Sequence, residues 1–228
     1  MYVSIIILPL LSLLLLCVGG RWVNQKIMES ASCGLIFGVC IISCFGLIEV
    51  VLNQTSIIIP LFTWIKSGSL SADLSLCFDS LSLLLIIFYC LVSICIQTYC
   101  IANSSIRTKN LSRTLSFLVF LMTLFLASNN LLQLYLGWEM IGLTSFLLFK
   151  VSKEFDNQEP TLIKKFLIQR VGSFFILLIT AVSYVSFDTV IIGEIFYVVS
   201  REVDIKYAIL WFTPNISLLL AVLIVLAT

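Results

Sequence analysis

Long apolar stretches separated by short polar segments dominate this sequence. An α-helix needs about 20 apolar residues to cross a hydrocarbon layer about 30 Å thick, and seven stretches approach that length. We expect transmembrane helices at Tyr2–Val18, Ser32–Leu52, Phe78–Ile101, Leu111–Ala127, Leu131–Phe149, Leu162–Val185 and Ile209–Thr228. The pattern therefore predicts an all-α, polytopic membrane bundle of about seven transmembrane helices.

The segments between the apolar stretches differ in character. Ser128–Asn130 is so short that the helices on either side of it should be antiparallel neighbours. Gln54–Cys77 is interfacial in composition, and we expect Trp64 at the depth of the lipid headgroups. Phe187–Tyr207 has apolar residues spaced as on a short helix that lies on the membrane surface.

Lys and Arg are unevenly distributed between alternate connections. The first, third and fifth connections, with the helix ends beside them, hold nine of these residues, and the second, fourth and sixth hold three, with Arg170 set aside as intramembrane. Because cytoplasmic loops carry the excess of positive charge, we expect the amino terminus outside and Thr228 at the inner face.

Composition excludes several classes of function. Hydrophobic residues make up 61% of the 228 residues and charged ones 11%, whereas a soluble domain has about 25% charged residues. The net charge of +1 gives no basic surface for nucleic acid, and there is no His. Eight Cys lie in or beside apolar stretches without a C-x-x-C pair. We therefore expect no redox cofactor, metal site or His-dependent nucleophile in this chain.

The two ends of the chain carry expectations of their own. No basic residue precedes Tyr2–Val18 and no small-residue cleavage site follows it, so we expect a retained first helix and not a signal peptide. Leu218–Ala227 is still apolar with nothing polar beyond it. Either the last helix ends flush with the membrane, or the chain is the first piece of something longer.

Glu139 is the main candidate for chemistry, because it stands near the middle of the fifth apolar stretch. A charged side chain at mid-membrane costs roughly 2.5–3.5 kcal/mol on insertion scales, so it should face protein or water and have a partner. A carboxyl group held there can take a proton from one side and release it to the other. The alternative is a hydrogen bond between helices, which a neutral residue would provide at lower cost.

Three basic residues of the sixth stretch are further candidates. Arg170 lies about two turns inside and, being always charged, needs a carboxylate or a hydrated cavity unless it snorkels to the inner face. Lys164 could serve as a relay member, whereas snorkelling is the favoured interpretation of Lys165. Asp79, at the start of the third stretch, is interpreted as a helix cap.

An ordered set of short segments runs along nearly the whole chain: Leu8-Pro9-Leu10, Gly20-Arg21, Leu61-Phe62-Thr63-Trp64-Ile65-Lys66-Ser67-Gly68, Phe78-Asp79-Ser80-Leu81, Gly137-Trp138-Glu139-Met140-Ile141-Gly142, Ile163-Lys164, Arg170-Val171-Gly172 and Asp188. In this order the segments resemble the amino-terminal half of chain 5 of respiratory complex I, NADH–ubiquinone oxidoreductase, a family related to the Mrp-type cation/proton antiporter subunits.

The resemblance implies that Glu139, Lys164 and Arg170 are proton-translocating residues. It implies an antiporter-like inverted-repeat fold, in which residues 1–101 are helices 1–3 and residues 102–228 an incomplete first repeat. It also implies a proton-pumping membrane-arm subunit, with NAD, FMN, iron–sulfur clusters and ubiquinone bound by other subunits. The expected location is the mitochondrial inner membrane, with a bacterial plasma membrane as the alternative.

Two departures from the family pattern stand out. Ser173 replaces the acid that usually follows R-V-G, so Arg170 lacks a local counter-ion. The chain also ends at Ala227-Thr228, before the family's next lysine and its second repeat. We expect a split subunit, with a second polypeptide supplying the carboxy-terminal part and other membrane-arm subunits and lipid as further partners. An Mrp-type antiporter subunit, a seven-helix receptor and a scaffold protein are the alternatives.

Overall fold

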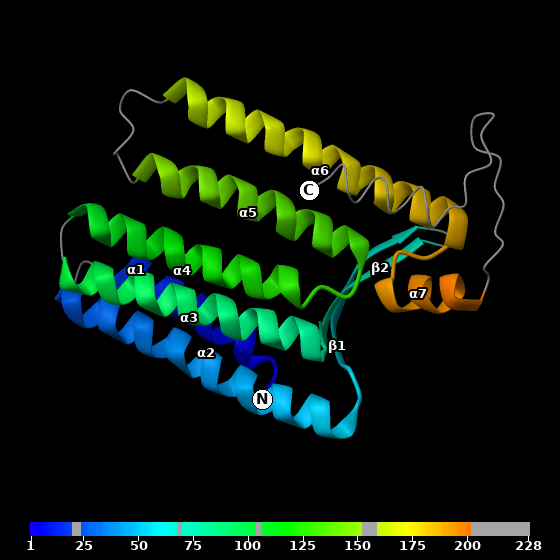
Figure 1. Cartoon of the computed structure of the whole chain (residues 1–228), viewed down its shortest axis with the longest axis horizontal. Helices are drawn as coiled ribbons and strands as arrows, with labels where there is room; N and C mark the ends of the chain where they lie inside the picture. Colours follow the sequence, from blue (N-terminus) through cyan, green and yellow to red (C-terminus); the bar gives the residue numbers. More distant parts are fainter. Residues whose placement is uncertain (20–23, 68–69, 104–105, 152–158, 202–228) are drawn as a thin grey trace.

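A computed structural model describes residues 1–19, 24–67, 70–103, 106–151 and 159–201. Six helices lie side by side with their long axes roughly aligned, and a short helix and a two-stranded hairpin lie at one end of them (Figure 1). The helices are α1 (Ser4–Val18), α2 (Gln25–Asn53), α3 (Ser80–Ala102), α4 (Ile106–Leu126), α5 (Leu131–Val151), α6 (Glu159–Phe187) and α7 (Ile192–Arg201). The strands are β1 (Ile57–Ser67) and β2 (Leu70–Phe78).

Five of these helices, α2 to α6, contain stretches long and apolar enough to cross a membrane, and α1 is a shorter apolar helix. This confirms a predominantly helical, multi-pass membrane protein. The surface helix expected within Phe187–Tyr207 corresponds to α7. The last predicted helix, Ile209–Thr228, lies outside the described residues.

The predicted start of the second helix at Ser32 was wrong. Helix α2 begins at Gln25, where the Asn24 side chain accepts a hydrogen bond from the Lys26 backbone N–H at 3.3 Å. Asn is a favoured residue at this capping position because its side-chain oxygen satisfies a free N–H of the first turn. The hydrophobic pattern marks the apolar part of a helix, and here the helix continues past it through a polar turn.

The antiparallel hairpin β1–β2 was not expected, although its second strand has a clear signal. Residues 70–78 alternate apolar and polar side chains, which is the period-two pattern of a half-buried strand. Ala72, Leu76 and Phe78 of this strand are buried, and the two strands pair from Ile57 opposite Phe78 to Ser67 opposite Leu70. The hairpin adds a small sheet to one end of the helical bundle.

Backbone hydrogen bonds attach the hairpin to the α4–α5 connection, and that connection to the one between α6 and α7. The Cys77 N–H donates to the Ala127 carbonyl at 2.8 Å, where α4 ends. Leu131 N–H donates to Val190 O and Ile192 N–H to Asn129 O, both at 3.0 Å. The α4–α5 and α6–α7 connections therefore meet beside β2 (Figure 1).

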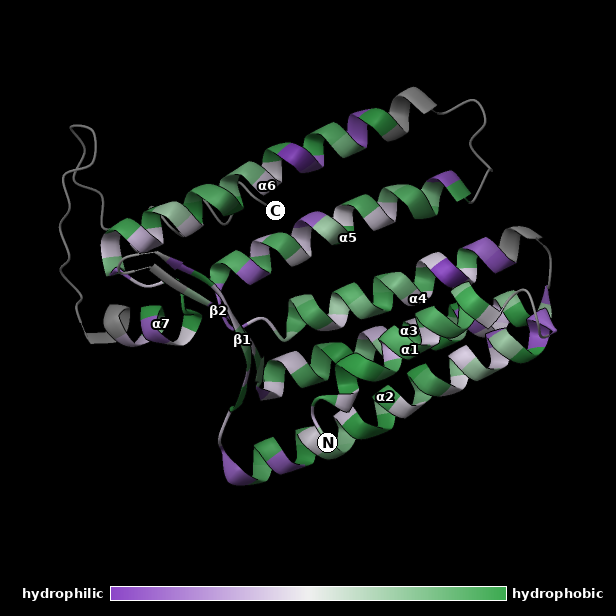
Figure 2. Ribbon diagram, turned by 180° about the vertical axis from the view of Figure 1, so that it is seen from behind, coloured by the Kyte–Doolittle hydropathy of each residue, from purple (hydrophilic) through white to green (hydrophobic). Residues whose placement is uncertain are grey.

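The hydrophobic core lies among α1, α2, α3 and α4, where Ile5, Ile36, Ile86 and Val119 are fully buried. Helix α4 also packs against α5, as the short Ser128–Asn130 connection predicts, and α5 packs against α6. The division at residues 101 and 102 stays a prediction. Figure 2 shows hydrophobic residues along the lengths of the helices, and α5 and α6 hold the candidate site between them.

Candidate functional site

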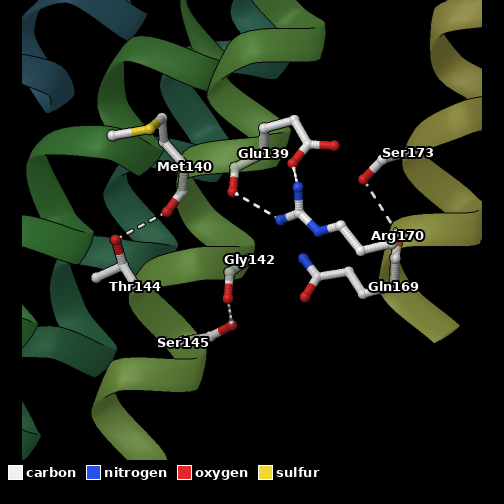
Figure 3. A network of polar contacts seen from close by, with 8 residues as sticks. All are labelled: Glu139, Met140, Gly142, Thr144, Ser145, Gln169, Arg170 and Ser173. Atoms are coloured by element: carbon white, nitrogen blue, oxygen red, sulfur yellow. Dashed lines mark hydrogen bonds and ion pairs between the residues drawn. The ribbon is translucent and has the colours of Figure 1, made fainter. Parts of the chain in front are cut away.

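Glu139 lies near the middle of α5, on the side that faces α6 (Figure 3). Its side chain is 13% exposed. Because α5 and α6 are both long and apolar enough to cross a membrane, a carboxylate between them is shielded from bulk water and its charge must be balanced locally. The sequence predicted a partner for this carboxylate and a carboxylate or hydrated cavity for Arg170.

Arg170 of α6 is that partner, and its Nη1 forms an ion pair with Glu139 Oε2. Nη2 of the same guanidinium lies 3.5 Å from the Glu139 backbone carbonyl oxygen. The guanidinium carbon lies 4.7 Å from the centre of the Phe166 ring, one turn away on α6, a range in which ring and cation attract. Arg170 thus points across to α5 instead of snorkelling along its own helix.

The pair is more open on the arginine side. The Arg170 side chain is 32% exposed, compared with 13% for Glu139. Its Nε is buried and has no hydrogen-bond partner within the described part of the chain. Arg170 therefore has a free donor beside the pair, which a water molecule or another polar group could use.

Ser173 does not replace the missing acid. Its hydroxyl is buried and donates to the Gln169 carbonyl of the preceding turn at 3.1 Å. On α5, Thr144 donates in the same way to Met140 O and Ser145 to Gly142 O, at 2.8 and 2.9 Å (Figure 3). These hydroxyls are satisfied by their own helices, so Arg170 takes its counter-ion from α5.

Gly142 leaves room on α5 for the Gln169 side chain of α6, beside the ion pair. A Cβ atom at this position would lie 1.8 Å from Gln169 Nε2 and 2.4 Å from its Cδ. The side-chain amide of Gln169 therefore occupies the space that any other residue would fill. Neither Gly142 nor Gln169 was predicted as a residue of the site. Gln169 could have been predicted, because it is a polar residue next to Arg170 in an otherwise apolar helix.

A small cleft of about 70 Å³ lies along the same helix interface. Its lining includes Gly142, Ser145, Lys165 and Gln169, together with the rings of Phe146, Phe149 and Phe166. A water molecule occupies about 30 Å³ of the liquid, so the cleft has room for water next to a polar wall. It runs from Gln169 toward Lys165, which is closer to the start of α6.

The candidate lysines take different positions. Lys164 is exposed and forms no hydrogen bond or ion pair in the described part of the chain, so the structure does not bring it to Glu139. Lys165 lines the cleft, and its Nζ lies 6.0 Å from the centre of the Phe149 ring. The relay role of Lys164 stays a prediction.

Asp79 is a helix cap, as predicted. Its Oδ1 accepts a hydrogen bond from Ser82 N–H at 2.8 Å, and its own N–H donates to Ser82 Oγ at 2.9 Å. Among the described residues, no three His, Cys, Asp or Glu side chains are placed to hold a metal ion.

Two family models match the chain. Residues 64–102 match the amino-terminal model of NADH-ubiquinone oxidoreductase (complex I) chain 5, and residues 128–228 match the NADH:quinone oxidoreductase/Mrp antiporter transmembrane model. The second match contains Glu139, Lys164 and Arg170.

Several curated relatives have similar sequences. NADH-ubiquinone oxidoreductase chain 5 of Chondrus crispus is 33% identical over 76% of this chain, and that of Marchantia polymorpha is 30% identical over 86%. NADH-quinone oxidoreductase subunit L of Rickettsia bellii is 32% identical over 80%. The aligned regions cover 26%, 30% and 29% of these relatives, so this chain spans less than a third of their length.

Solved structures share the fold. The Mrp complex from Dietzia sp. matches 99% of this chain and 22% of its own, with a TM-score of 0.74 and 15% identity. The archaeal membrane-bound sulfane sulfur reductase matches 98% of this chain and 32% of its own, with a TM-score of 0.68 and 17% identity. From its sequence and its fold together, this chain is a relative of NADH-ubiquinone oxidoreductase chain 5 and resembles the amino-terminal part of that antiporter-like family.

Proposed function

We propose that this chain is the amino-terminal part of a proton-translocating membrane-arm subunit of NADH:ubiquinone oxidoreductase. One observation carries the proposal: Glu139 of α5 is ion-paired with Arg170 of α6 between two helices that can cross a membrane. Electron transfer would take place in other subunits, which would hold NAD, FMN, iron–sulfur clusters and ubiquinone. This chain would contribute proton movement to the enzyme.

Arg170 controls the charge of Glu139 in this mechanism. Arginine does not lose its proton in proteins, so its position decides how well a negative charge on Glu139 is stabilised. While the two groups are paired, the carboxylate is held in its ionised form. When the guanidinium withdraws, the Glu139 carboxylate accepts one proton from water on one side, and it releases that proton to the other side when the pair forms again.

The contacts of Arg170 suit such a movement. The guanidinium is held by the Phe166 ring and the Glu139 carbonyl oxygen as well as by the carboxylate. It can therefore leave the carboxylate without losing every contact at once. A charge that moves elsewhere in the assembled complex could shift this balance, since electrostatic interactions are strong where water is excluded.

Lys164 would donate a proton to a neighbouring segment or accept one from it. It lies six residues before Arg170 on α6 and is exposed there. The cleft beside Gln169, which Lys165 lines, is the space through which water would reach Glu139 from the same end of the helix.

The chain would need partners to act as a pump. We propose that other membrane-arm subunits surround it, since its relatives are named as a chain or subunit of NADH oxidoreductases, and that a second polypeptide supplies the carboxy-terminal part of chain 5. We place the complex in the mitochondrial inner membrane, in line with the algal, fungal and plant relatives named chain 5. The Rickettsia relative leaves a bacterial membrane as the competing location.

The deciding experiment is Glu139→Gln in the assembled complex, with proton pumping and NADH oxidation measured in the same vesicles. Glutamine preserves the shape of the side chain but cannot carry a proton, so the number of protons pumped per NADH oxidised should fall. Glu49→Gln is a suitable control, because Glu49 is exposed on α2 and accepts a hydrogen bond from Tyr2. Undiminished pumping by a fully assembled Glu139→Gln complex would refute the relay role.

An Mrp-type antiporter subunit is the second candidate, because one of the two matching family models covers both kinds of protein. Gentle purification of the native complex separates the two. Flavin and iron–sulfur subunits that purify with this chain support the oxidoreductase, whereas their absence from an intact complex supports the antiporter.

A further inference from the structure

The cleft between α5 and α6 begins one helical turn from the ion pair. Gly142 and Ser145 follow Glu139 along α5 by one and two turns, and both line the cleft. Phe166, which precedes Arg170 by one turn on α6, lines it from the other side. The cleft therefore extends from the pair toward the end of the bundle opposite the hairpin (Figure 1), which is the predicted inner face.

The Arg170 side chain already lies toward this cleft. Side chains of an α-helix tilt toward its amino-terminal end, and for α6 this is the end at which the cleft lies. The guanidinium carbon is 4.7 Å from the centre of the Phe166 ring, and that ring is part of the cleft wall. The guanidinium can therefore move from Glu139 into the cleft without leaving the Phe166 ring.

The cleft holds groups that suit a guanidinium. The ring of Phe146 lies 5.2 Å from that of Phe166, measured between centres, and aromatic faces attract cations. Ser145 donates its hydroxyl hydrogen to Gly142 O, and its oxygen remains an acceptor. A volume of about 70 Å³ has room for about two water molecules or for the flat guanidinium group in their place.

Gln169 supplies a further acceptor at the entrance of the cleft. Its side-chain amide lies beside Gly142, next to the Arg170 guanidinium (Figure 3). The amide forms no hydrogen bond with the described part of the chain, so its Oε1 atom is available to the N–H groups of a guanidinium. Gln169 thus offers Arg170 a neutral partner one turn from the charged one.

Lys165 places a positive charge at the far end of the same cleft. Its Nζ lies 6.0 Å from the centre of the Phe149 ring, and both residues line the cleft. Among the described residues of the lining, Lys165 is the charged one. Because like charges repel, and repel more strongly where water is scarce, Lys165 opposes the entry of a second cation.

We propose that the cleft is the second position of the Arg170 guanidinium, an inference that rests on the proposed function. In this position the guanidinium contacts Phe166, Gln169 Oε1 and Ser145 Oγ, and the Glu139 carboxylate accepts one proton from water. When the guanidinium returns, the carboxyl group releases that proton. Gln169 and Lys165 are positioning residues with opposite effects, since Gln169 stabilises the second position and Lys165 destabilises it.

Infrared spectroscopy of the assembled complex tests this proposal, since a protonated carboxyl group has a carbonyl band that a carboxylate lacks. The Glu139 band is the one that Glu139→Gln removes, and it is compared at a pH at which wild type is partly protonated. Gln169→Leu loses a hydrogen bond to a cation, so the ratio of protonated to ionised Glu139 should fall about tenfold or more. Lys165→Met should raise this ratio, and Lys165→Arg should restore it.

Two controls separate movement of Arg170 from other effects. Lys150→Met removes the same charge from the last turn of α5, where Lys150 is exposed and outside the cleft lining, and should leave the band unchanged. The second control repeats Lys165→Met in an Arg170→Gln complex, at the pH at which that complex is half protonated. There the substitution should have no effect, because no guanidinium is left to repel.

Opposite changes in Gln169→Leu and Lys165→Met support the second position. Unchanged bands, changes in the same direction, or a Lys165→Met effect that persists in Arg170→Gln would overturn it. If Gln169→Leu does not assemble, the Lys165 variants decide alone. Normal pumping by Glu139→Gln with opposite band changes would refute the relay and leave the second position standing, so the two failures are distinguishable.

Discussion

Two glycines of α5 make a matched pair for testing the site, because alanine meets different atoms at each. Substitution of a helical glycine by alanine gains about 1 kcal/mol in helix propensity. At Gly142 the new methyl carbon would lie 1.8 Å from Gln169 Nε2. At Gly137 it would lie 3.0 Å from the Cβ and 3.2 Å from the Cα of Phe125 on α4.

The two clashes differ in what can move. The Gln169 amide is the end of a flexible side chain and can swing aside, so Gly142→Ala should leave stability unchanged or raise it by up to about 1 kcal/mol. The Phe125 Cα is backbone, so Gly137→Ala must push α4 and α5 apart. Overpacking costs about 1–3 kcal/mol, which leaves a net loss of up to about 2 kcal/mol.

The effects of the two substitutions on proton pumping should be opposite in order to their effects on stability. Gly142→Ala displaces Gln169 from the cleft beside Arg170 and should lower the number of protons pumped per NADH oxidised. Gly137→Ala leaves the α5–α6 contact intact, so any complex that assembles should pump normally but lose activity at a lower temperature. Thermal inactivation and pumping, measured on the same vesicles, separate these effects. Equal stability losses in the two variants would refute this interpretation of the close approach at Gly142.

Two further predictions concern the hairpin end. Asn130→Ala removes the donor to Asp73 O at 2.5 Å and the acceptor of Gln133 N–H at 2.7 Å, so thermal inactivation should show a loss of about 1–3 kcal/mol; unchanged stability would contradict a role in attaching β2. Burial, with a smaller contribution from Asp79, raises the pKa of the Cys77 thiol above its ordinary value of 9.0. Because the thiolate is the reactive form, maleimide labelling of Cys77 should be slow at neutral pH and still increase with pH above 9.0, whereas a rate that levels off below that value would contradict the burial effect.

Hydrophobic pattern predicted the spanning helices and missed the hairpin for a clear reason. A run of about 20 apolar residues has few alternatives to a spanning helix in a membrane. Helices α3, α5 and α6 accordingly lie close to the predicted ranges. The segment Gln54–Cys77 was interpreted by its composition, which is equally compatible with an interfacial loop. The alternation in β2 carries the strand signal, but its pairing with β1 depends on contacts that composition does not contain.

Part of the chemistry of the candidate site could be predicted from the sequence. An acid in one apolar helix and an arginine in the next predict a partner for each, but rotation of the two helices decides whether they meet. Packing of α5 on α6 brings Glu139 to Arg170 and leaves Lys164 exposed. The close contact of Gln169 with Gly142 depends on the same packing, and sequence spacing alone could not predict it.

Glu29 shows why buried polar groups near helix ends escape a hydropathy analysis. The buried residues of α2 recur at intervals of three and four, beginning with Glu29, Ser32 and Ile36, so this acid belongs to the same stripe as the core. Its position is dictated by helical periodicity, while its polarity placed it outside the predicted span. A search for polar residues that continue an apolar stripe would have found it. The same pattern on α3 includes Gln97, whose Oε1 atom is also buried and has no hydrogen-bond partner among the described residues.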